Sequence, residues 1–438
     1  MPEPSVDNLK DASPKKIRDL KVEIITAIAQ VDVTSLVIEL SLYEDIYDPF
    51  VKGDLTIADN SGIISGLPVL GQELVKIKFS RSGHEIEKTF ACTRVRGIKK
   101  LVGETAGAVL SLTSQKHLTN AVSMFSKSYK GLSSDIIQKI HSDAFGEDID
   151  IVSESGSAHS IVFPYIKPYA AINAILRKTT AADGTPYFLY ENLFGEKPIL
   201  KSLQAMCDEP SDTVLKKNVN SNADTDMGFG QRDNPSTIGQ LYEFEVLKNA
   251  DTLKLLSSGA LVGTTARINL ANNEYVESPF LYKTDAKTIA PLDQFQEYQI
   301  DDQRLDSGLM SPSYRSEFYN PIAYESEGVT ELNTNLDPAA RTKAASRLNR
   351  MNNMFRLSLY TDSAPKKYMV GKCINLDLPI NAPGVANGDM KDELFSGKYL
   401  ITRLRHYIKG EEYTMSIEVI RDGISIPKNK TDVGEPGP

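Results

Sequence analysis

Alternation of apolar and polar residues is the strongest pattern near the start of the chain. In SLVIELSLYEDIYDPFVKGDLTIAD (35–59), a leucine or isoleucine occupies every second position from Leu36 to Leu42. A period of two predicts a strand with one buried face. A turn is expected at Asp48-Pro49, and the alternation resumes after Gly53. The segment therefore predicts a strand, a bend and a return strand.

Strand patterns of the same kind continue to about residue 113. In ELVKIKF (73–79), Val75, Ile77 and Phe79 share one face, and two lysines lie on the other. The segments EKTFACTRVRGIKKL and AVLSLTS continue the pattern, and glycines separate them. Short strands with glycine-bearing turns are typical of an antiparallel barrel or sandwich.

The pattern changes to helical spacing after His117. LSSDIIQKIHSDAFG (132–146) carries an isoleucine stripe and ends at Gly146, a typical helix stop. KPYAAINAILRKTTAADG (167–184) has Pro168 in its first turn and a similar apolar stripe. TPYFLYEN then predicts a strand. These features predict a mixed α/β segment that follows an all-β one.

The second half of the chain combines strands with one helix. Residues 208–236 are polar and predict a long loop or an inter-domain connection, and residues 276–335 are poorly patterned and predict irregular structure. DPAARTKAASRLNRMNNM (337–354) predicts a basic helix, and IGQLYEFEVL, GTTARINL and the segments after 354 predict strands. In the last strand, Tyr413–Val419 alternates buried and exposed positions, and Glu418 on the outer face is expected to contribute little to folding.

Composition narrows the class of protein. A chain of 438 residues with 41% apolar residues is long enough for about three domains. Its net charge of -9 makes a phosphate-coating surface improbable and would keep a pore lining from sticking to DNA. Three widely spaced cysteines, Cys92, Cys207 and Cys373, predict free buried thiols. The polar start predicts no secretory signal, and no apolar run predicts a membrane span.

Enzyme motifs are incomplete in this sequence. HEIEK begins like a zinc-protease motif at His84, but Lys88 stands where the second histidine is needed. The five histidines are widely dispersed in the sequence. A nucleophile elbow is absent, and SGIISG lacks the lysine of a phosphate-binding loop. We therefore expect no enzyme activity, and no catalytic, metal-binding or cofactor-binding residues.

Three groups of residues nevertheless have alternative interpretations. Glu44 and Asp45 could be a carboxylate pair, but beside a proline turn they are expected to be solvated. The helix with Arg341, Lys343, Arg347 and Arg350 could bind nucleic acid, but a solvated face or a protein-docking surface is favoured. A third group of aromatic residues could line a ligand groove but is expected to pack a domain junction: Phe163, Tyr165 and Tyr169.

The order of the segments resembles the baseplate central hub protein of contractile-tailed bacteriophages, whose fold is shared with the N-terminal part of type VI secretion spike proteins. The resemblance rests on LSLYEDIYDPFVKGDLTIADNSGI before GLPVLGQELVKIKF, and on IVFPYIKPYAAINAILRKT before GTPYFLYEN. It rests also on VGKCINLDLP and SGKYLITRLRHYIKGEEYTMSIEVIRDGI near the end. The sequence departs from the family most in residues 276–335.

The resemblance implies a mainly β fold with α+β insertions, containing two antiparallel β-barrels like those of the tail tube. The expected divisions follow the chain: 1–22, N-terminal arm; 23–115, barrel one; 116–232, mixed α/β domain; 233–275 with 340–425, barrel two; 276–339, insertion; 426–438, C-terminal tail.

The resemblance also implies a function. Three copies would carry six barrels, so a homotrimer could join a hexameric tail tube to a trimeric central spike and enclose the channel for DNA. Further implied partners are a tube-initiator protein, the tape measure protein and baseplate wedge proteins. The expected location is the virion tail baseplate, assembled in the host cytoplasm. Alternatives are a type VI or phage-like injection-system spike hub, a tail-associated cell-wall hydrolase and a tail-tip protein of a non-contractile phage.

Overall fold

The computed structural model describes residues 17–59, 71–81, 84–100, 106–155, 158–211, 213–217, 240–269, 273–285, 292, 314–319, 338–362, 365–378, 392 and 394–423. Most of the expected N-terminal arm, the C-terminal tail and much of the 276–339 insertion lie outside these residues, as does most of the loop expected at 208–236.

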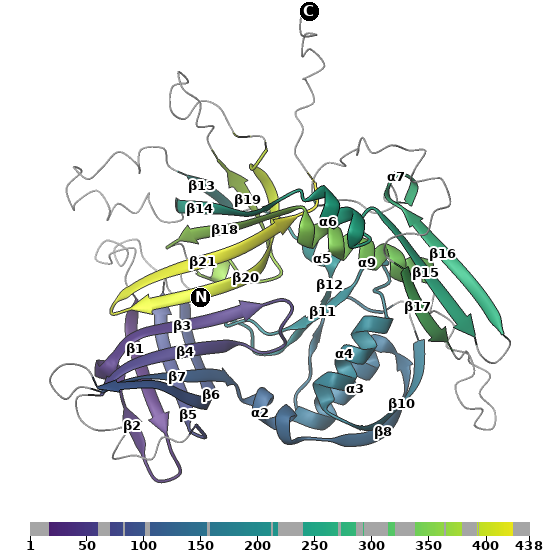
Figure 1. Cartoon of the computed structure of the whole chain (residues 1–438). Coiled ribbons are helices and arrows are strands. Elements are labelled where there is room, and N and C mark those ends of the chain that lie inside the picture. Colours follow the sequence, from purple (N-terminus) through teal and green to yellow (C-terminus); the bar gives the residue numbers. More distant parts are fainter. Residues whose placement is uncertain are drawn as a thin grey trace, which may run out of the picture.

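A 13-stranded sheet runs through the molecule (Figure 1). Its N-terminal half has the order β3-β4-β7-β6-β5-β1-β2. The elements of this half are β1 Arg18–Ile25, β2 Gln30–Asp32, the 3-10 helix η2 Thr34–Leu36, β3 Val37–Asp45, β4 Lys52–Asp59, β5 Leu74–Arg81, β6 His84–Lys100 and β7 Ala106–Ser114. The strand, bend and return strand predicted for 35–59 are β3 and β4, which pair antiparallel.

The C-terminal half of the sheet has the order β19-β13-β14-β18-β21-β20. Its elements are β13 Val214–Lys217, β14 Gln240–Asn249, β18 Phe355–Thr361, the 3-10 helix η6 Pro365–Lys367, β19 Cys373–Asp377, β20 Gly397–Lys409 and β21 Glu412–Arg421. An additional antiparallel pairing joins β19 to β20, so this half returns on itself. The prediction of a loop over 208–236 is wrong for β13, which pairs with both β14 and β19.

The mainly β class with α+β insertions is confirmed. The two β-rich units are joined into one sheet instead of standing apart as two closed antiparallel barrels. Among the described residues, the N-terminal half ends in the three-residue strand β2. The C-terminal half returns on itself only through β13, whose short pairings with β14 and β19 are parallel. The remaining pairings within the large sheet are antiparallel, as predicted.

A mixed α/β unit follows β7, as the sequence predicts. Its elements are α2 Gln115–Val122, β8 Phe125–Leu132, α3 Ser133–Phe145, β9 Asp150–Ile151, β10 Ala158–Ile166, α4 Pro168–Lys178, β11 Tyr187–Tyr190, β12 Ile199–Ser202 and α5 Leu203–Cys207. Gly146 ends α3 at a φ of 70°, a left-handed conformation that glycine adopts without strain. Pro168 begins α4, where its missing N–H costs no helical hydrogen bond.

A second group of insertions lies on the far side of the molecule from the N-terminal half (Figure 1). Its elements are α6 Thr252–Ser257, β15 Val262–Asn269, β16 Glu274–Leu281, α7 Tyr282–Asp285, β17 Tyr314–Tyr319 and α9 Pro338–Asn353. β15 belongs to a separate sheet with β16 and β17, and not to the second β-rich unit as expected. Because β16 and β17 are regular strands, the prediction of irregular structure over 276–335 is wrong for them.

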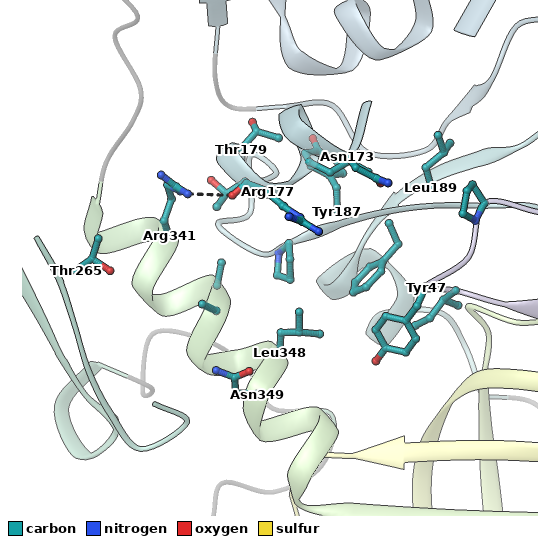
Figure 2. Close-up of a pocket in the computed structure, with 18 residues that line it drawn as sticks. Tyr47, Asn173, Arg177, Thr179, Tyr187, Leu189, Thr265, Arg341, Leu348 and Asn349 are labelled. Carbon is teal, nitrogen blue, oxygen red and sulfur yellow. Dashed lines mark hydrogen bonds between the residues drawn. The ribbon is translucent and has the colours of Figure 1, made fainter. Parts of the chain in front are cut away.

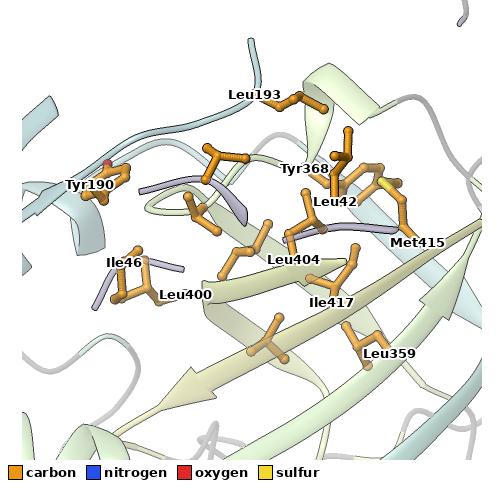
Figure 3. Packing of buried hydrophobic residues seen from close by; sticks show 14 of the residues in the cluster. Leu42, Ile46, Tyr190, Leu193, Leu359, Tyr368, Leu400, Leu404, Met415 and Ile417 are labelled. Atoms are coloured by element: carbon orange, nitrogen blue, oxygen red, sulfur yellow. The ribbon is translucent and has the colours of Figure 1, made fainter. Parts of the chain in front are cut away.

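One hydrophobic core spans both halves of the large sheet (Figure 3). Leu42 of β3, Leu404 of β20 and Ile417 of β21 are all buried within it. The predicted alternation of the last strand is confirmed, because its inward residues Tyr413 and Ile417 have no exposed surface. A smaller core beneath α3 and α4 supports the mixed unit. The two halves of the large sheet are therefore held together by side-chain packing as well as by backbone hydrogen bonds.

The three cysteines are free and buried, as predicted. Burial raises the pKa of the Cys92 thiol to about 11 and that of Cys373 to about 12. Both thiols are therefore protonated at neutral pH and poor nucleophiles. Within the described part of the chain, no helix is long and apolar enough to cross a membrane.

Candidate functional site at the junction between the sheet halves

The junction between the two halves is the antiparallel pair β20–β3. Seven residue pairs join the strands, from Arg403 opposite Asp45 to Lys409 opposite Glu39. On one face of the junction, Arg403 Nε donates to Asp45 Oδ2 over 2.7 Å. Tyr407 donates its hydroxyl to Glu39 over 2.8 Å. Cross-strand pairs of this kind stabilise a sheet, so the junction is specified by charge as well as by backbone hydrogen bonds.

A buried polar chain crosses the junction on its other face. Glu44 Oε1 lies 2.9 Å from His406 Nε2, and His406 Nδ1 lies 2.6 Å from the Tyr413 hydroxyl. Burial raises the pKa of Tyr413 well above its ordinary value, so the hydroxyl stays protonated. Glu44 also accepts from the backbone N–H of Leu193 over 3.0 Å, which attaches the mixed unit to the junction.

The expectation that Glu44 and Asp45 are solvated turn residues is wrong for Glu44. β3 continues through Asp45, and the alternation turns the Glu44 side chain inward, where only 1% of its surface is exposed. Asp45 lies on the outer face and pairs with Arg403. Although Glu44 and His406 form an acid–base pair, both side chains have no exposed surface. A substrate cannot reach them, so this arrangement serves packing and orientation.

The remaining histidines do not gather at this site. The HEIEK segment lies on β6, and Lys88 donates to the carbonyl of Gly195. A zinc-protease motif needs a helix to bring two ligands to one face, and a strand does not provide that spacing. Among the residues that the structure describes, histidine, cysteine, aspartate and glutamate form no group of three able to hold a metal ion.

The basic helix α9 is less solvated than its sequence predicts. Arg347 and Arg350 have at most 2% of their surface exposed, and both guanidinium groups face Asp422 at 3.4 and 3.5 Å. Arg350 also lies 4.6 Å from the ring of Tyr282. Arg341 donates to the carbonyl of Arg177 over 3.0 Å. The arginines of α9 thus hold the helix against the rest of the protein. Because Arg347 and Arg350 are buried, they do not form a nucleic-acid patch.

The aromatic residues near α4 divide into two kinds. Phe163 and Tyr169 are buried, and Tyr169 packs edge-on against Phe50, with ring centroids 4.6 Å apart. Because Phe50 follows β3, Tyr169 helps to pack a junction between units, as expected. The rings that Phe163 contacts, Phe125 and Tyr129, belong to the mixed unit itself. Tyr165 is instead 75% exposed, at a bulge of β10 with a φ of 38°.

A pocket of about 420 Å³ lies between α4, β11 and α9 (Figure 2). Arg177 and Arg341 lie at one end, and Tyr47 at the other. Burial raises the pKa of Tyr47 to about 12, and its hydroxyl donates to Asn352 Oδ1 over 2.6 Å. The described lining contains no aspartate, glutamate, histidine or cysteine. The pocket therefore lacks a general base at neutral pH.

The two halves of the sheet repeat one topology. In the N-terminal half, four neighbouring strands lie in the order β3-β4-β7-β6. Numbered by their place along the chain, these are the first, second, fourth and third of the four strands. The C-terminal half has the order β14-β18-β21-β20, which follows the same rule. β5 pairs with the start of β6, and β19 pairs with the start of β20. Five strands of the N-terminal half therefore have an equivalent in the C-terminal half: β3 with β14, β4 with β18, β5 with β19, β6 with β20 and β7 with β21.

Bulges and sequence support this equivalence. The register of β6 against β7 shifts between Cys92 and Arg94, and that of β20 against β21 shifts between Ile401 and Arg403. The skipped residues are Thr93 and Thr402, which begin the matching sequences TRVR and TRLR. Equivalent shifts also occur in β3 after Val37 and in β14 after Leu241. The repeated T-R-x-R motif is the sequence signal by which the two halves could have been aligned.

A mainly β chain with these features has the fold of phage tail and baseplate hub proteins. Similar solved structures include the tail protein from Neisseria meningitidis MC58, with a TM-score of 0.52 and 11% identity over 93% of this chain and 98% of that one. Another is the 43 kDa tail protein of prophage MuSo2 from Shewanella oneidensis, with a TM-score of 0.50 and 10% identity over 92% and 98%.

A third similar structure is an Escherichia coli protein described as a component of the type VI secretion system. Its TM-score is 0.42, at 11% identity over 93% of this chain and 76% of that one. No family model and no curated protein matches the sequence. The expected resemblance to the hub fold is confirmed by the two tail proteins, and at such low identity the likeness concerns the fold.

Proposed function

We propose that this protein is a structural hub of a phage tail baseplate, acting as a homotrimeric ring between tube and spike. The observation that carries the proposal is the repeated topology of the two sheet halves within one chain. Three copies of such a chain present six equivalent halves to a hexameric tail tube. The same three copies present true threefold symmetry to a trimeric central spike.

The mechanism of such a hub is geometric. The junction β20–β3 fixes the two halves of one copy at a constant angle, and the shared core keeps that angle rigid. The ring would enclose a channel through which DNA passes transiently. An overall charge of -9 is compatible with a lining that repels DNA phosphates. The proposal assigns no catalytic step to this chain, because its acid–base pair is buried and the pocket between α4, β11 and α9 lacks a base.

Partners follow from the position of such a ring. The tail tube or a tube-initiator protein would contact one face, and the central spike the other. The tape measure protein would end in the channel, and wedge proteins would surround the ring. The proposed location is the virion tail, with assembly in the host cytoplasm. The similarity of the fold to two proteins named as tail proteins supports this assignment.

Purified protein provides the test. Light scattering coupled to size-exclusion chromatography should give a mass three times the chain mass of 48.3 kDa at micromolar concentration. Negative-stain images should show a threefold ring with an open centre. A monomer at every concentration, together with particles that lack this protein at the baseplate, would overturn the proposal. Release of peptidoglycan fragments by the purified protein would favour the hydrolase alternative instead.

A further inference from the structure

We propose that neighbouring copies join by antiparallel pairing of the end of β6 in one copy with β14 in the next. The proposal deepens the hub function and rests on it for the number of copies. To the hub function it adds which strands pair between copies, that they run antiparallel, and which side chains meet. The internal junction β20–β3 is the template, because β20 is equivalent to β6 and β3 is equivalent to β14.

Both strands present an open edge at the required place. The first part of β6, from His84 to Ala91, pairs with β5, and Gly71 lies against Thr93. From Val95 to Lys100, β6 pairs with β7 on one side, and no described strand lies on the other. In β20 the corresponding section is the one that pairs with β3. The equivalent partner of β6 is therefore missing within the described chain.

β14 offers the complementary edge. Its first residues, Gln240 and Leu241, pair with β13, while β18 occupies the opposite side along most of the strand. From Glu245 to Asn249, no described strand lies on the side away from β18. Val246 and Leu247 are 37% and 43% exposed there. An open apolar edge promotes aggregation unless another chain covers it.

Charge favours a second copy as the occupant. Arg94 and Arg96 are exposed on the β6 edge, and Glu243 and Glu245 are exposed on β14. The two edges of a single copy thus carry opposite charges and differ in position. Such a contact is head-to-tail, and repeated copies of it close into a ring when the rotation permits. Opposite charges across an edge also fix the register of the strands.

The internal junction predicts which side chains meet. Arg405 of β20 donates to the Ser41 hydroxyl of β3 from two guanidinium nitrogens, over 2.9 and 3.2 Å. The T-R-x-R repeat makes Arg96 the equivalent of Arg405, and the matching bulges make Glu245 the equivalent of Ser41. Arg96 of one copy should therefore meet Glu245 of the next. Its present contact with Asp54 uses one nitrogen, and 47% of the side chain is exposed, so other donors remain available.

The experiment reverses these charges singly and together. Light scattering at one fixed protein concentration would compare the wild type with Arg96→Glu, Glu245→Arg and the double variant. Each single variant places like charges in every interface of the ring, so the trimer peak should be lost. The double variant restores opposite charges in every interface and should regain the trimer. An equimolar mixture of the single variants pairs only in alternation, which an odd-numbered ring cannot close, so it should not regain the trimer.

Controls separate folding from assembly. Lys139→Glu makes the same charge change at an exposed position of α3 and should leave the trimer intact. Arg96→Glu also removes the ion pair with Asp54, so its melting temperature can fall for a reason other than assembly. Within the described chain Glu245 forms no ion pair, so the melting temperature of Glu245→Arg should match the wild type. A wild-type trimer that both single variants retain would overturn this interface and leave the hub function standing. A wild type that never forms a ring would overturn both.

Discussion

Glu44 and His406 are 362 positions apart in the sequence, yet their side chains share a 2.9 Å hydrogen bond in the core of the junction. One belongs to the N-terminal half of the sheet and the other to the C-terminal half. Neither has solvent-exposed side-chain surface. The contact therefore makes the stability of each half depend on the presence of the other.

Glu44→Ala should destabilise the whole chain. It leaves His406 Nε2 and the backbone N–H of Leu193 buried without their acceptor. Such a loss typically costs about 2–4 kcal/mol of unfolding free energy. Urea denaturation followed by circular dichroism would measure it. Glu44→Gln is the matched control, because its amide oxygen can still accept both hydrogen bonds, and it should lose less. Equal stability of the Ala variant and the wild type would contradict the role assigned to Glu44.

Ile417→Asp should be severely destabilising. Ile417 has no exposed surface and lies at the centre of β21 in the shared core. A carboxylate there would be buried without a partner, at a cost of about 3 kcal/mol or more. The variant is expected in the insoluble fraction or with a strongly lowered melting temperature. A soluble variant that melts with the wild type would show that β21 is misplaced.

Glu418→Lys should be measurably destabilising, contrary to the expectation from the alternating pattern. Glu418 lies near Arg403 and Arg356, with closest distances of 3.3 and 3.6 Å, and it accepts from the Thr402 hydroxyl. A lysine would replace these attractions with repulsion between cations, at a cost of about 1 kcal/mol on this partly exposed face. Glu418→Gln should lose less. A melting temperature unchanged in the Lys variant, even at low salt, would show that these contacts contribute nothing.

Acid should weaken the mixed unit through His141. Desolvation by burial lowers the pKa of His141 from 6.5, although its hydrogen bond with the Glu147 carbonyl partly raises it. The unfolded chain then binds a proton at higher pH than the folded chain does. The contribution of His141 to the unfolding free energy is therefore constant above about pH 7, and it falls as the pH drops through about 6.5 toward the folded pKa.

The measurement compares His141→Gln with the wild type. The glutamine amide can still donate to the Glu147 carbonyl but does not titrate. Unfolding free energies at about pH 7.5 and about pH 5.5 should differ less in the variant than in the wild type. Identical pH dependence in the two proteins would argue against a buried neutral imidazole at this position.

Asp422→Asn should release α9 from the sheet. Asp422 is the carboxylate that faces both Arg347 and Arg350, and all three side chains are buried. Removing its charge leaves two guanidinium groups in the interior, which typically costs about 3–5 kcal/mol. Limited proteolysis should cut near α9 faster in the variant than in the wild type. Lys343→Gln, on the half-buried face of the same helix, is the control and should leave proteolysis unchanged.

Local patterns predicted the elements whose formation depends on their own residues. The alternation in Tyr413–Val419, the stripe of α3 with its stop at Gly146, and Pro168 at the start of α4 are all confirmed. These signals work because backbone conformation and one-sided burial are encoded within a few residues. The fold class followed from the order of such elements along the chain.

Pairings between distant residues could not be predicted in this way. A polar side chain at a strand end is usually solvated, and only the approach of β20 makes Glu44 a buried acceptor. The charges of α9 predict a solvated face unless the position of Asp422 is known. β15 has a strand pattern, but the pattern does not specify its partners β16 and β17. For Glu44, for α9 and for the pairing of β15 with β17, the partner lies far away in the sequence and leaves no local periodicity.

The antiparallel junction β20–β3 also sets how the two halves of one copy resist mechanical load. Its backbone hydrogen bonds run perpendicular to the strands. A force along the strands loads all seven residue pairs at once in shear, whereas a force across them peels the pairs apart one after another. The junction is therefore mechanically anisotropic, and it resists force best along the axis of β3.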